Sequence, residues 1–261
     1  MAMRSRSWLN RSLRQWAKAE WTRLGDTVPQ VGSKGLRSLR DEARALRCDL
    51  DRFLLRTDQR VVASQTELAA IPLPGGTDWR WRPEALSARI TPTGMAAPES
   101  GIRLGDSAAV WHDCNERALV LRQTQNAHVT DLAAFGLRLE VLGFTGSFLS
   151  LAVDLPDEAL AGLSRNHIIR VETAMQAEQD LDIYARLNIG NGPNTEEQVH
   201  HLGRMQPEDI CTHVTEFDLE MTEMNEKRLD KIWIDLIFEK PFMNAVVIRE
   251  MIFSRHPRAN V

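Results

Sequence analysis

The sequence contains few cysteines, one tyrosine and no long apolar segment. Its 261 residues include three Cys and one Tyr, and no apolar run approaches the ~18 residues that a transmembrane helix needs. Because the cysteines are also far apart, a disulfide scaffold is excluded. The remaining composition, 43% hydrophobic and 26% charged residues, is typical of an ordinary globular protein.

The common nucleotide and hydrolase motifs are absent as well. No GxxxxGK[ST], GxGxxG, GxSxG or HExxH string occurs, which removes the main support for ATP, NAD, serine-hydrolase and zinc-protease chemistry. Cys114 and Cys211 each have a nearby histidine, His112 and His213, and thiolate with imidazole suits zinc. Their spacing favours a structural role, so we expect no metal and no other cofactor.

The modest net charge of −4 conceals two oppositely charged parts. Residues 1–60 hold 14 Lys and Arg against 7 Asp and Glu, a net charge of +7, whereas the rest holds 18 against 29, a net charge of −11. Five of the 11 prolines lie in residues 61–110, and their spacing prevents long helices there. We predict a basic helical head at 1–60, a Pro/Gly-rich connector partly packed on the body at 61–104, and a folded domain at 105–261.

Residues 4–24 are predicted to form an amphipathic helix. Leu9, Leu13 and Leu24 share one arc at 100° per residue with Trp16, and basic residues occupy the opposite side. Such a helix suits an anionic membrane surface, and docking on a partner or on the protein's own body is the alternative. The residues assigned to this contact are Arg4, Arg11, Arg14, Trp16 and Lys18.

A second helix is predicted after Gly32, with apolar residues spaced by three and four. The pattern lasts less than three heptads, so a coiled coil, a helical hairpin and self-association all fit. Acidic residues interrupt its arginine row, which argues against binding of nucleic acid. The apolar positions are Leu36, Leu39, Ala43, Leu46, Leu50 and Phe53.

The body is predicted to be a mainly β protein, a jelly-roll β-sandwich behind the two-helix basic extension. Short alternating runs recur without long helices between them. In residues 181–189, for example, every second residue is apolar, which indicates a strand with one buried face. Residues 156–167 are expected to form a short helix. The eight expected strands are 118–124, 135–144, 147–155, 167–175, 181–189, 213–221, 231–238 and 246–254.

Two resemblances accompany this pattern. The run SFLSLAVDLPDEALAGLSRNHIIRVETAM and the later VVIREMIFSR resemble galactose-binding-like jelly rolls, many of which are carbohydrate-binding modules. The strings DWRWRPE, ARLNIGNGPNTE, NEKR and WIDLIFEKPFMN resemble a bacterial (proteobacterial) family of uncharacterised proteins. That family carries no assigned activity, and the fold class implies a ligand-presenting scaffold rather than a defined function.

Polar and aromatic residues on the outward faces of three predicted strands form the candidate binding site. An indole or phenol ring stacks on a sugar while charged and amide groups hydrogen-bond its hydroxyls. A merely solvated sheet face is the simpler interpretation. Carboxylates among Glu216, Asp218 and Asp235 can alternatively supply a glycosidase acid and base. The assigned ligand-binding residues are Tyr184, Arg186, Asn188, Asp218, Trp233 and Asp235.

Residues 190–195, GNGPNT, are expected to begin a loop that extends to about residue 211 and contacts a ligand or forms a plain turn.

The leading hypothesis is a non-enzymatic carbohydrate-binding-like protein whose basic N-terminus attaches to a membrane surface or helical partner. The alternatives are an assembly protein that forms homo-oligomers through its N-terminal helices and a carboxylate-dependent glycoside-active enzyme. Unpaired cysteines and the lack of a secretory signal predict a cytoplasmic location, peripheral at the inner membrane if the head binds lipid.

Overall fold

A computed structural model describes residues 2–30, 32, 35–47, 49–50, 71–128, 130–207 and 209–258, without the side chains of residues 2–14 and 30. The chain forms two compact units, Met1–Thr57 and Asp58–Val261. The first unit is called the head below and the second the body. The finer division of the body into a connector and a domain at residue 104 stays a prediction.

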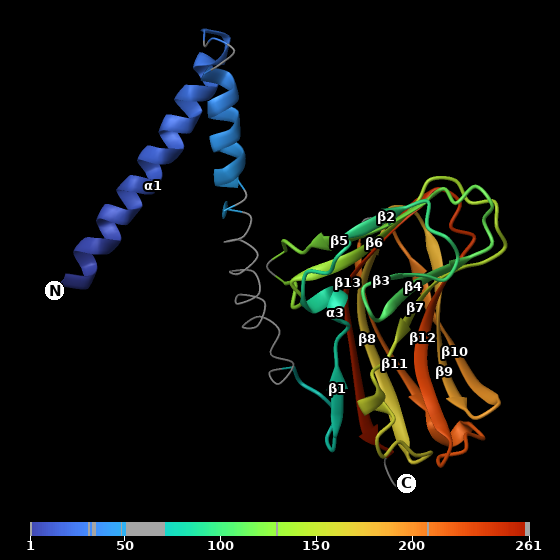
Figure 1. Ribbon diagram of the computed structural model, residues 1–261. Helices are drawn as coiled ribbons and strands as arrows, with labels where there is room; N and C mark the ends of the chain where they lie inside the picture. Colours follow the sequence, from blue (N-terminus) through green and yellow to red (C-terminus); the bar gives the residue numbers. More distant parts are fainter. Residues whose placement is uncertain are drawn as a thin grey trace. The chain divides into compact units, whose positions relative to one another are not determined.

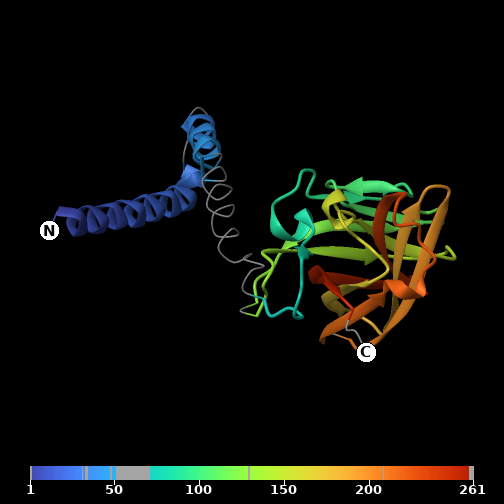
Figure 2. The ribbon, with the colours of Figure 1, turned by 90° about the horizontal axis from the view of Figure 1, so that it is seen from below.

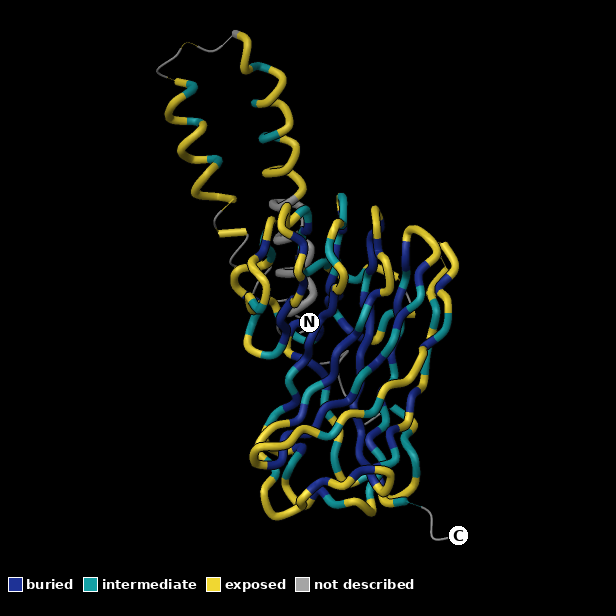
Figure 3. The backbone as a smooth tube through the Cα atoms, turned by 90° about the vertical axis from the view of Figure 1, so that its right-hand side faces the viewer, coloured by how far each residue is buried: buried dark blue, intermediate teal, exposed yellow. Residues whose placement is uncertain are grey.

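The head contains the two predicted helices (Figure 1). Helix α1 spans Ala2–Thr27, the 3-10 helix η1 spans Val28–Gln30, and a second helix covers residues 35–47 and 49–50. No described side chain of the head is fully buried, and Trp16 is 66% exposed (Figure 3). The side chains of Arg4, Arg11 and Arg14, and Phe53 as a whole, lie outside the described part. Among the helices that the structure describes, none is long and apolar enough to cross a membrane.

The body is a β-sandwich of two antiparallel sheets, as predicted (Figures 1 and 2). The first sheet has seven strands in the order β11-β8-β13-β6-β5-β2, with β1 also paired to β13. The second has six strands in the order β10-β9-β12-β7-β4-β3.

The seven-stranded sheet consists of β1 (Trp79–Trp81), β2 (Gly94–Ala96), β5 (Leu119–Gln125), β6 (Phe135–Val141), β8 (His167–Ala177), β11 (Ile210–Asp218) and β13 (Asn244–Pro257). The six-stranded sheet consists of β3 (Ile102–Leu104), β4 (Ala108–His112), β7 (Leu149–Asp154), β9 (Leu181–Asn191), β10 (Asn194–Met205) and β12 (Leu229–Glu239). The described part of the body also contains three short helices: α3 (Glu84–Ser87), η3 (Asp157–Ala159) and η4 (Leu219–Met221).

Alternating side chains explain why these segments form two facing sheets. On β9, Leu181, Ile183 and Leu187 are at most 3% exposed and point into the core, whereas Tyr184 and Arg186 point outward. The inward residues of both sheets form one apolar core (Figure 3). Burial of this apolar surface is the main force that holds the sheets together. Each of the eight predicted strand segments overlaps a strand of the structure.

One local prediction is confirmed only in part, and another is wrong. The short helix predicted at residues 156–167 is the 3-10 helix η3, which starts after Pro156 with two acidic residues but covers only Asp157–Ala159. The supposed loop from residue 190 to about 211 contains β10, which forms a hairpin with β9. Strand β10 is an edge strand with exposed polar residues on both faces, and its register shifts between His201 and Gly203, so it lacks the clean alternation that identifies a strand.

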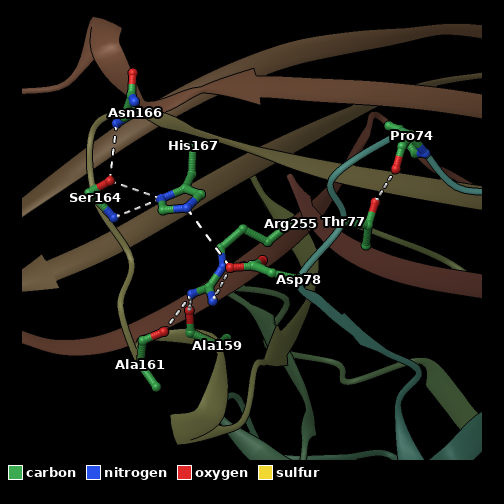
Figure 4. A network of polar contacts seen from close by, with 9 residues as sticks. All are labelled: Pro74, Thr77, Asp78, Ala159, Ala161, Ser164, Asn166, His167 and Arg255. Carbon is green, nitrogen blue, oxygen red and sulfur yellow. Dashed lines mark hydrogen bonds and ion pairs between the residues drawn. The ribbon is translucent and has the colours of Figure 1, made fainter. Parts of the chain in front are cut away.

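A cluster of polar contacts closes one end of the sandwich (Figure 4). The Arg255 guanidinium binds both carboxylate oxygens of Asp78 at 2.9 Å and donates to the carbonyls of Ala159 and Ala161. These hydrogen bonds from Arg255 hold the pKa of the Asp78 carboxyl below its ordinary value. The cluster therefore ties the segment before β1 and the η3 turn to the end of β13.

A buried ion pair joins the segment after β1 to the middle of β13. The Nε and Nη2 atoms of Arg82 donate hydrogen bonds to the two carboxylate oxygens of Glu250, each at 2.7 Å. Arg82 is 5% exposed and Glu250 is 8% exposed. Burial raises the pKa of the Glu250 carboxyl, while Arg82 acts in the opposite direction. A carboxylate this well buried depends on its partner, because an unpaired charge in the interior is costly.

We predict that Arg82→Met lowers the free energy of unfolding by about 3–5 kcal/mol, since it leaves the Glu250 carboxylate buried without a partner. The Glu250 carboxyl has a higher pKa in the folded than in the unfolded state. It therefore adds to the free energy of unfolding at pH values below its unfolded pKa, and this contribution is lost as pH rises through the folded pKa. The deficit of Arg82→Met should therefore shrink as pH falls toward the ordinary glutamate pKa of about 4.3. Urea unfolding at several pH values measures both effects.

The double variant Arg82→Met/Glu250→Gln should recover most of the loss, because no unpaired charge remains at this position. The control Arg204→Met removes an exposed ion pair between Arg204 on β10 and Asp180, and it should cost less than about 1 kcal/mol. Equal losses for Arg82→Met and Arg204→Met would contradict this account of the buried pair.

Candidate functional site

The outer face of the six-stranded sheet carries a groove of about 430 Å³. It crosses all the strands of this sheet except the edge strand β10. The lining residues are Arg103, Ala109, Trp111, Phe148, Ser150, Ala152, Asp154, Arg186, Lys231, Trp233, Asp235 and Ile237.

The groove is hollow because small residues occupy the middle of the sheet. Ala109 on β4 pairs with Ala152 on β7, and Ala152 pairs with Asp235 on β12. The next pair of outward-facing residues along β4 and β7 is Trp111 with Ser150. Outward side chains of paired strands lie side by side, so alanine and serine in the centre leave room between the larger residues around them.

Trp111 is an exposed aromatic residue of β4, and its ring lies against a glycine. Its side chain is 46% exposed, and a Cβ atom built on Gly101 would lie 3.0 Å from the indole ring. Gly101 also has a φ of 81°, a conformation that favours glycine. The close approach of the backbone therefore holds one side of the indole, and the exposed remainder is available for stacking. Phe148, also 46% exposed, adds a second ring to the lining.

A buried carboxylate organises the opposite part of the groove. Asp235 is 4% exposed and accepts hydrogen bonds from Arg186 at 2.9 Å and from the Asn188 amide at 3.0 Å. Both partners come from β9, whose residues Arg186 and Asn188 pair with Asp235 and Trp233. The ion pair therefore holds the Arg186 guanidinium, which keeps 34% side-chain exposure, at the edge of the groove.

A second carboxylate holds two cations. Asp154 binds Arg103 at 2.7 Å through one oxygen and Lys231 at 3.0 Å through the other. The Lys231 ammonium also lies 4.9 Å from the centre of the Trp233 ring, a cation–π contact. Arg103 further donates to the backbone carbonyl of Asp106. This part of the groove therefore combines two positive side chains with an aromatic ring.

The structure brings together part of the predicted binding site. Arg186, Trp233 and Asp235 line the groove. Asn188 shares this face but is 0% exposed, so it positions Asp235 rather than contacting a ligand directly. Tyr184 lies on the same face outside the groove lining.

Tyr184 and Asp218 have partners of their own. Tyr184 donates a hydrogen bond to Glu239, which raises the pKa of its phenol, and stacks 4.7 Å from His201. Asp218 lies on β11 in the other sheet, where it pairs with Arg258 at 2.9 Å and caps η4. It is therefore separate from the groove.

The three carboxylates considered for glycosidase chemistry lie on two faces. Glu216 and Asp218 point outward from the seven-stranded sheet, since Phe217 between them is buried in the core. Asp235 points outward from the six-stranded sheet. Stacked sheets lie about 10 Å apart, so Asp235 cannot act with either of the others on one glycosidic bond.

The two Cys–His pairs also lie apart. Cys114 follows β4 in the six-stranded sheet, whereas Cys211 lies on β11 in the other sheet. Both ring nitrogens of His112 have backbone partners, the amide of Cys114 and the carbonyl of Pro98. Within the described residues no group of three or more His, Cys, Asp and Glu side chains is arranged to hold a metal ion.

Sequence reasoning missed most of one side of the groove. Arg103, Trp111 and Ala109 lie on β3 and β4, in and next to the segment interpreted as a connector. Alternation in residues 108–112, with Ala108, Val110 and His112 buried and Trp111 exposed, was the available signal. A five-residue strand with two alanines gives too weak an alternation to stand out.

The fold and this groove define a β-sandwich protein with an aromatic-lined, charged groove on one outer sheet face. The chain belongs to a family of unknown function (DUF6478), whose model matches residues 1–261. No curated protein matches the sequence.

Several solved structures are similar to parts of the body. The enzymatically active domain of tailspike protein 4 from bacteriophage CBA120 has 4% identity and a TM-score of 0.42, over 56% of this chain and 19% of that one. The match thus spans about a fifth of the tailspike chain. The family 11 carbohydrate-binding module from Clostridium thermocellum, solved with a β-1,3-1,4-mixed-linked tetrasaccharide, has 10% identity and a TM-score of 0.40, over 59% of this chain and 92% of that one.

The C-terminal family 22 carbohydrate-binding module of Clostridium thermocellum Xyn10B has 11% identity and a TM-score of 0.40. The match covers 73% of this chain and 99% of that module.

We predict that Asp235→Ala lowers the free energy of unfolding by about 1–3 kcal/mol, because it removes the side-chain acceptor that the buried Asn188 amide and the Arg186 guanidinium share. Asp154→Ala is the control, since its cations are about half exposed and solvent replaces the lost contact. Urea unfolding of both variants measures the difference. A loss for Asp154→Ala as large as that for Asp235→Ala would rule out the organising role of Asp235.

Proposed function

We propose that the protein is a non-enzymatic carbohydrate-binding protein that holds a saccharide in the groove of the six-stranded sheet. The observation that carries the proposal is the half-exposed indole of Trp111, seated on Gly101 beside a hollow with charged edges. An aromatic ring of this kind stacks on the apolar side of a sugar ring. Arg186, Asp154 and Ser150 supply donors and acceptors for its hydroxyl groups.

The dimensions of the groove support this proposal. A volume of about 430 Å³ lies in the ordinary range of small-ligand sites, about 300–1,000 Å³. The groove is open, and its floor of Ala109, Ala152 and Ser150 lies between Trp111 on one side and Trp233 on the other. An extended oligosaccharide fits such a surface better than a compact ligand that must be enclosed.

The contacts in the groove favour binding over glycoside cleavage. Both carboxylates of the lining are already engaged: Asp235 accepts hydrogen bonds from Arg186 and Asn188, and Asp154 forms ion pairs with Arg103 and Lys231. Asp235 is also only 4% exposed, so little of its carboxylate can reach a glycosidic oxygen.

The head is proposed as an attachment element at the cytoplasmic membrane surface. Trp16 and Lys18 are exposed on α1, within the basic segment that also contains Arg4, Arg11 and Arg14. Indole and basic side chains suit the headgroup region of an anionic membrane.

Self-assembly through the head is the second candidate function. An apolar groove of about 360 Å³ lies between the two helices and is bordered by Trp21, Leu24, Leu36 and Leu39. Because no described side chain of the head is fully buried, a second copy would bury apolar surface that one head leaves exposed.

For the groove, we expect Trp111→Ala to weaken saccharide binding at least about tenfold, the loss typical of a central aromatic contact. Ala152→Leu should abolish binding by filling the floor. The control Phe242→Ala removes a 67% exposed aromatic ring outside the groove lining and should leave binding unchanged. A glycan array followed by calorimetry with the best saccharide measures all three. If Ala152→Leu folds and binds normally, the groove is not the site.

For the head, Trp16→Ala combined with Lys18→Glu should reduce binding of the full chain to anionic vesicles, and added salt should weaken it further. Vesicle co-sedimentation provides the measurement, with neutral vesicles as the control. Analytical ultracentrifugation of wild type and Leu39→Arg distinguishes assembly, because charge in the interhelical groove should dissociate an oligomer. If the wild-type protein is monomeric and does not bind anionic vesicles, both proposals for the head are contradicted.

A further inference from the structure

The Arg103 and Lys231 end of the groove bears an unbalanced positive charge. Asp154 is the shared carboxylate, with 23% side-chain exposure, whereas Arg103 and Lys231 are 47% and 54% exposed. Two cations and one anion leave a net charge of +1. The positive groups are also more exposed than the carboxylate that they share.

The Arg186 end is balanced differently. Its guanidinium binds Asp235 at 2.9 Å and lies 3.5 Å from the carboxylate of Glu197, which is 50% exposed. One cation here faces two anions, of which Asp235 lines the groove. The groove therefore runs from a positive end to an end without excess positive charge, and an anionic group on a ligand is attracted to the first.

From this arrangement we propose that the saccharide is acidic, and that its anionic group binds between Arg103 and Lys231. The inference rests on the proposed carbohydrate-binding function and specifies its substrate class. A sugar carboxylate, as in a uronic acid, or a sulfate or phosphate ester provides the required anion.

The geometry allows one ligand anion to reach both cations. Arg103 and Lys231 bind the two oxygens of a single carboxylate, at 2.7 and 3.0 Å, so their charged groups are close together. Charge-assisted hydrogen bonds of this type are stronger than neutral ones. Asp154 and the carbonyl of Asp106 hold the Arg103 guanidinium in place before a ligand arrives, which lowers the entropic cost of binding.

The Trp233 ring beside these two cations determines where a sugar lies along the groove. The Lys231 ammonium lies 4.9 Å from the centre of the Trp233 ring. A sugar whose ring contacts the aromatic lining can direct an acidic substituent to Lys231 and Arg103. Neutral sugars gain the stacking contact without the charge contact, so acidic sugars should bind more tightly.

The test compares oligouronides with the same oligomers after reduction of their carboxyl groups to alcohols. An array also presents sulfated and phosphorylated oligosaccharides beside their unmodified forms. Wild-type protein should bind an acidic member at least about tenfold more tightly than its neutral counterpart, and added salt should reduce the difference.

Two variants connect the preference to the proposed residues. Arg103→Gln should lower the ratio of acidic to neutral affinity about tenfold. Lys231→Gln should lower the same ratio, because it removes the second cation. Arg204→Gln, which alters an exposed ion-paired arginine on β10 outside the groove lining, is the matched control and should have no effect. Urea unfolding verifies that each variant is folded.

The outcomes separate the two proposals. A preference for uronides identifies a carboxylate as the anion, and a preference for esters identifies a sulfate or phosphate; either supports the inference. Equal binding of acidic and neutral partners overturns the acidic preference while the carbohydrate-binding function stands. No binding to any saccharide on the array overturns both.

Discussion

The buried carboxylate of Asp235 is the constraint on which the arrangement of the groove depends. Because Asp235 is only 4% exposed, its carboxylate needs hydrogen-bond donors from the protein. Arg186 and Asn188 on β9 are these donors, and they pair with Asp235 and Trp233 across the sheet. The register of β9 against β12 therefore determines both the packing of the sheet and the position of the Arg186 guanidinium. Since a shift of one residue would turn these groups into the core, the apolar interior and the polar groove enforce the same register.

The two outer faces of the sandwich use charge in different ways. On the seven-stranded sheet, Arg170 on β8 pairs with Glu172 on the same strand and with Glu216 on the neighbouring β11, and Glu250 on β13 forms the buried pair with Arg82. On the six-stranded sheet, the ion pairs surround small residues and exposed rings, and they leave cations accessible. Charge pairs on the first face hold strands and segments together, whereas those on the second also line the groove.

Alternation predicted the sandwich because the longer strands bury one face: residues 181–189 and 231–238 were placed correctly and lie side by side as β9 and β12. This pairing also brought Arg186, Trp233 and Asp235 together as expected. Strand β10 was missed, and no bounds were predicted for the strands before residue 118, since short or edge strands bury too few side chains to show alternation. Asp218 was grouped with the wrong sheet because sequence alone does not show which strands become neighbours. Trp111 and Arg103 were overlooked because their short strands show too little alternation.

The most direct test of the groove as a saccharide site is an NMR titration that follows the indole N–H signals of the seven tryptophans. Assignments come from single Trp→Phe variants, and the titrant is the saccharide that binds best on the array. The account predicts saturable shifts of the Trp111 and Trp233 signals, while the signals of Trp16 and Trp21 in the head stay unchanged. Shifts confined to other tryptophans, or no shift at saturating saccharide, would contradict it.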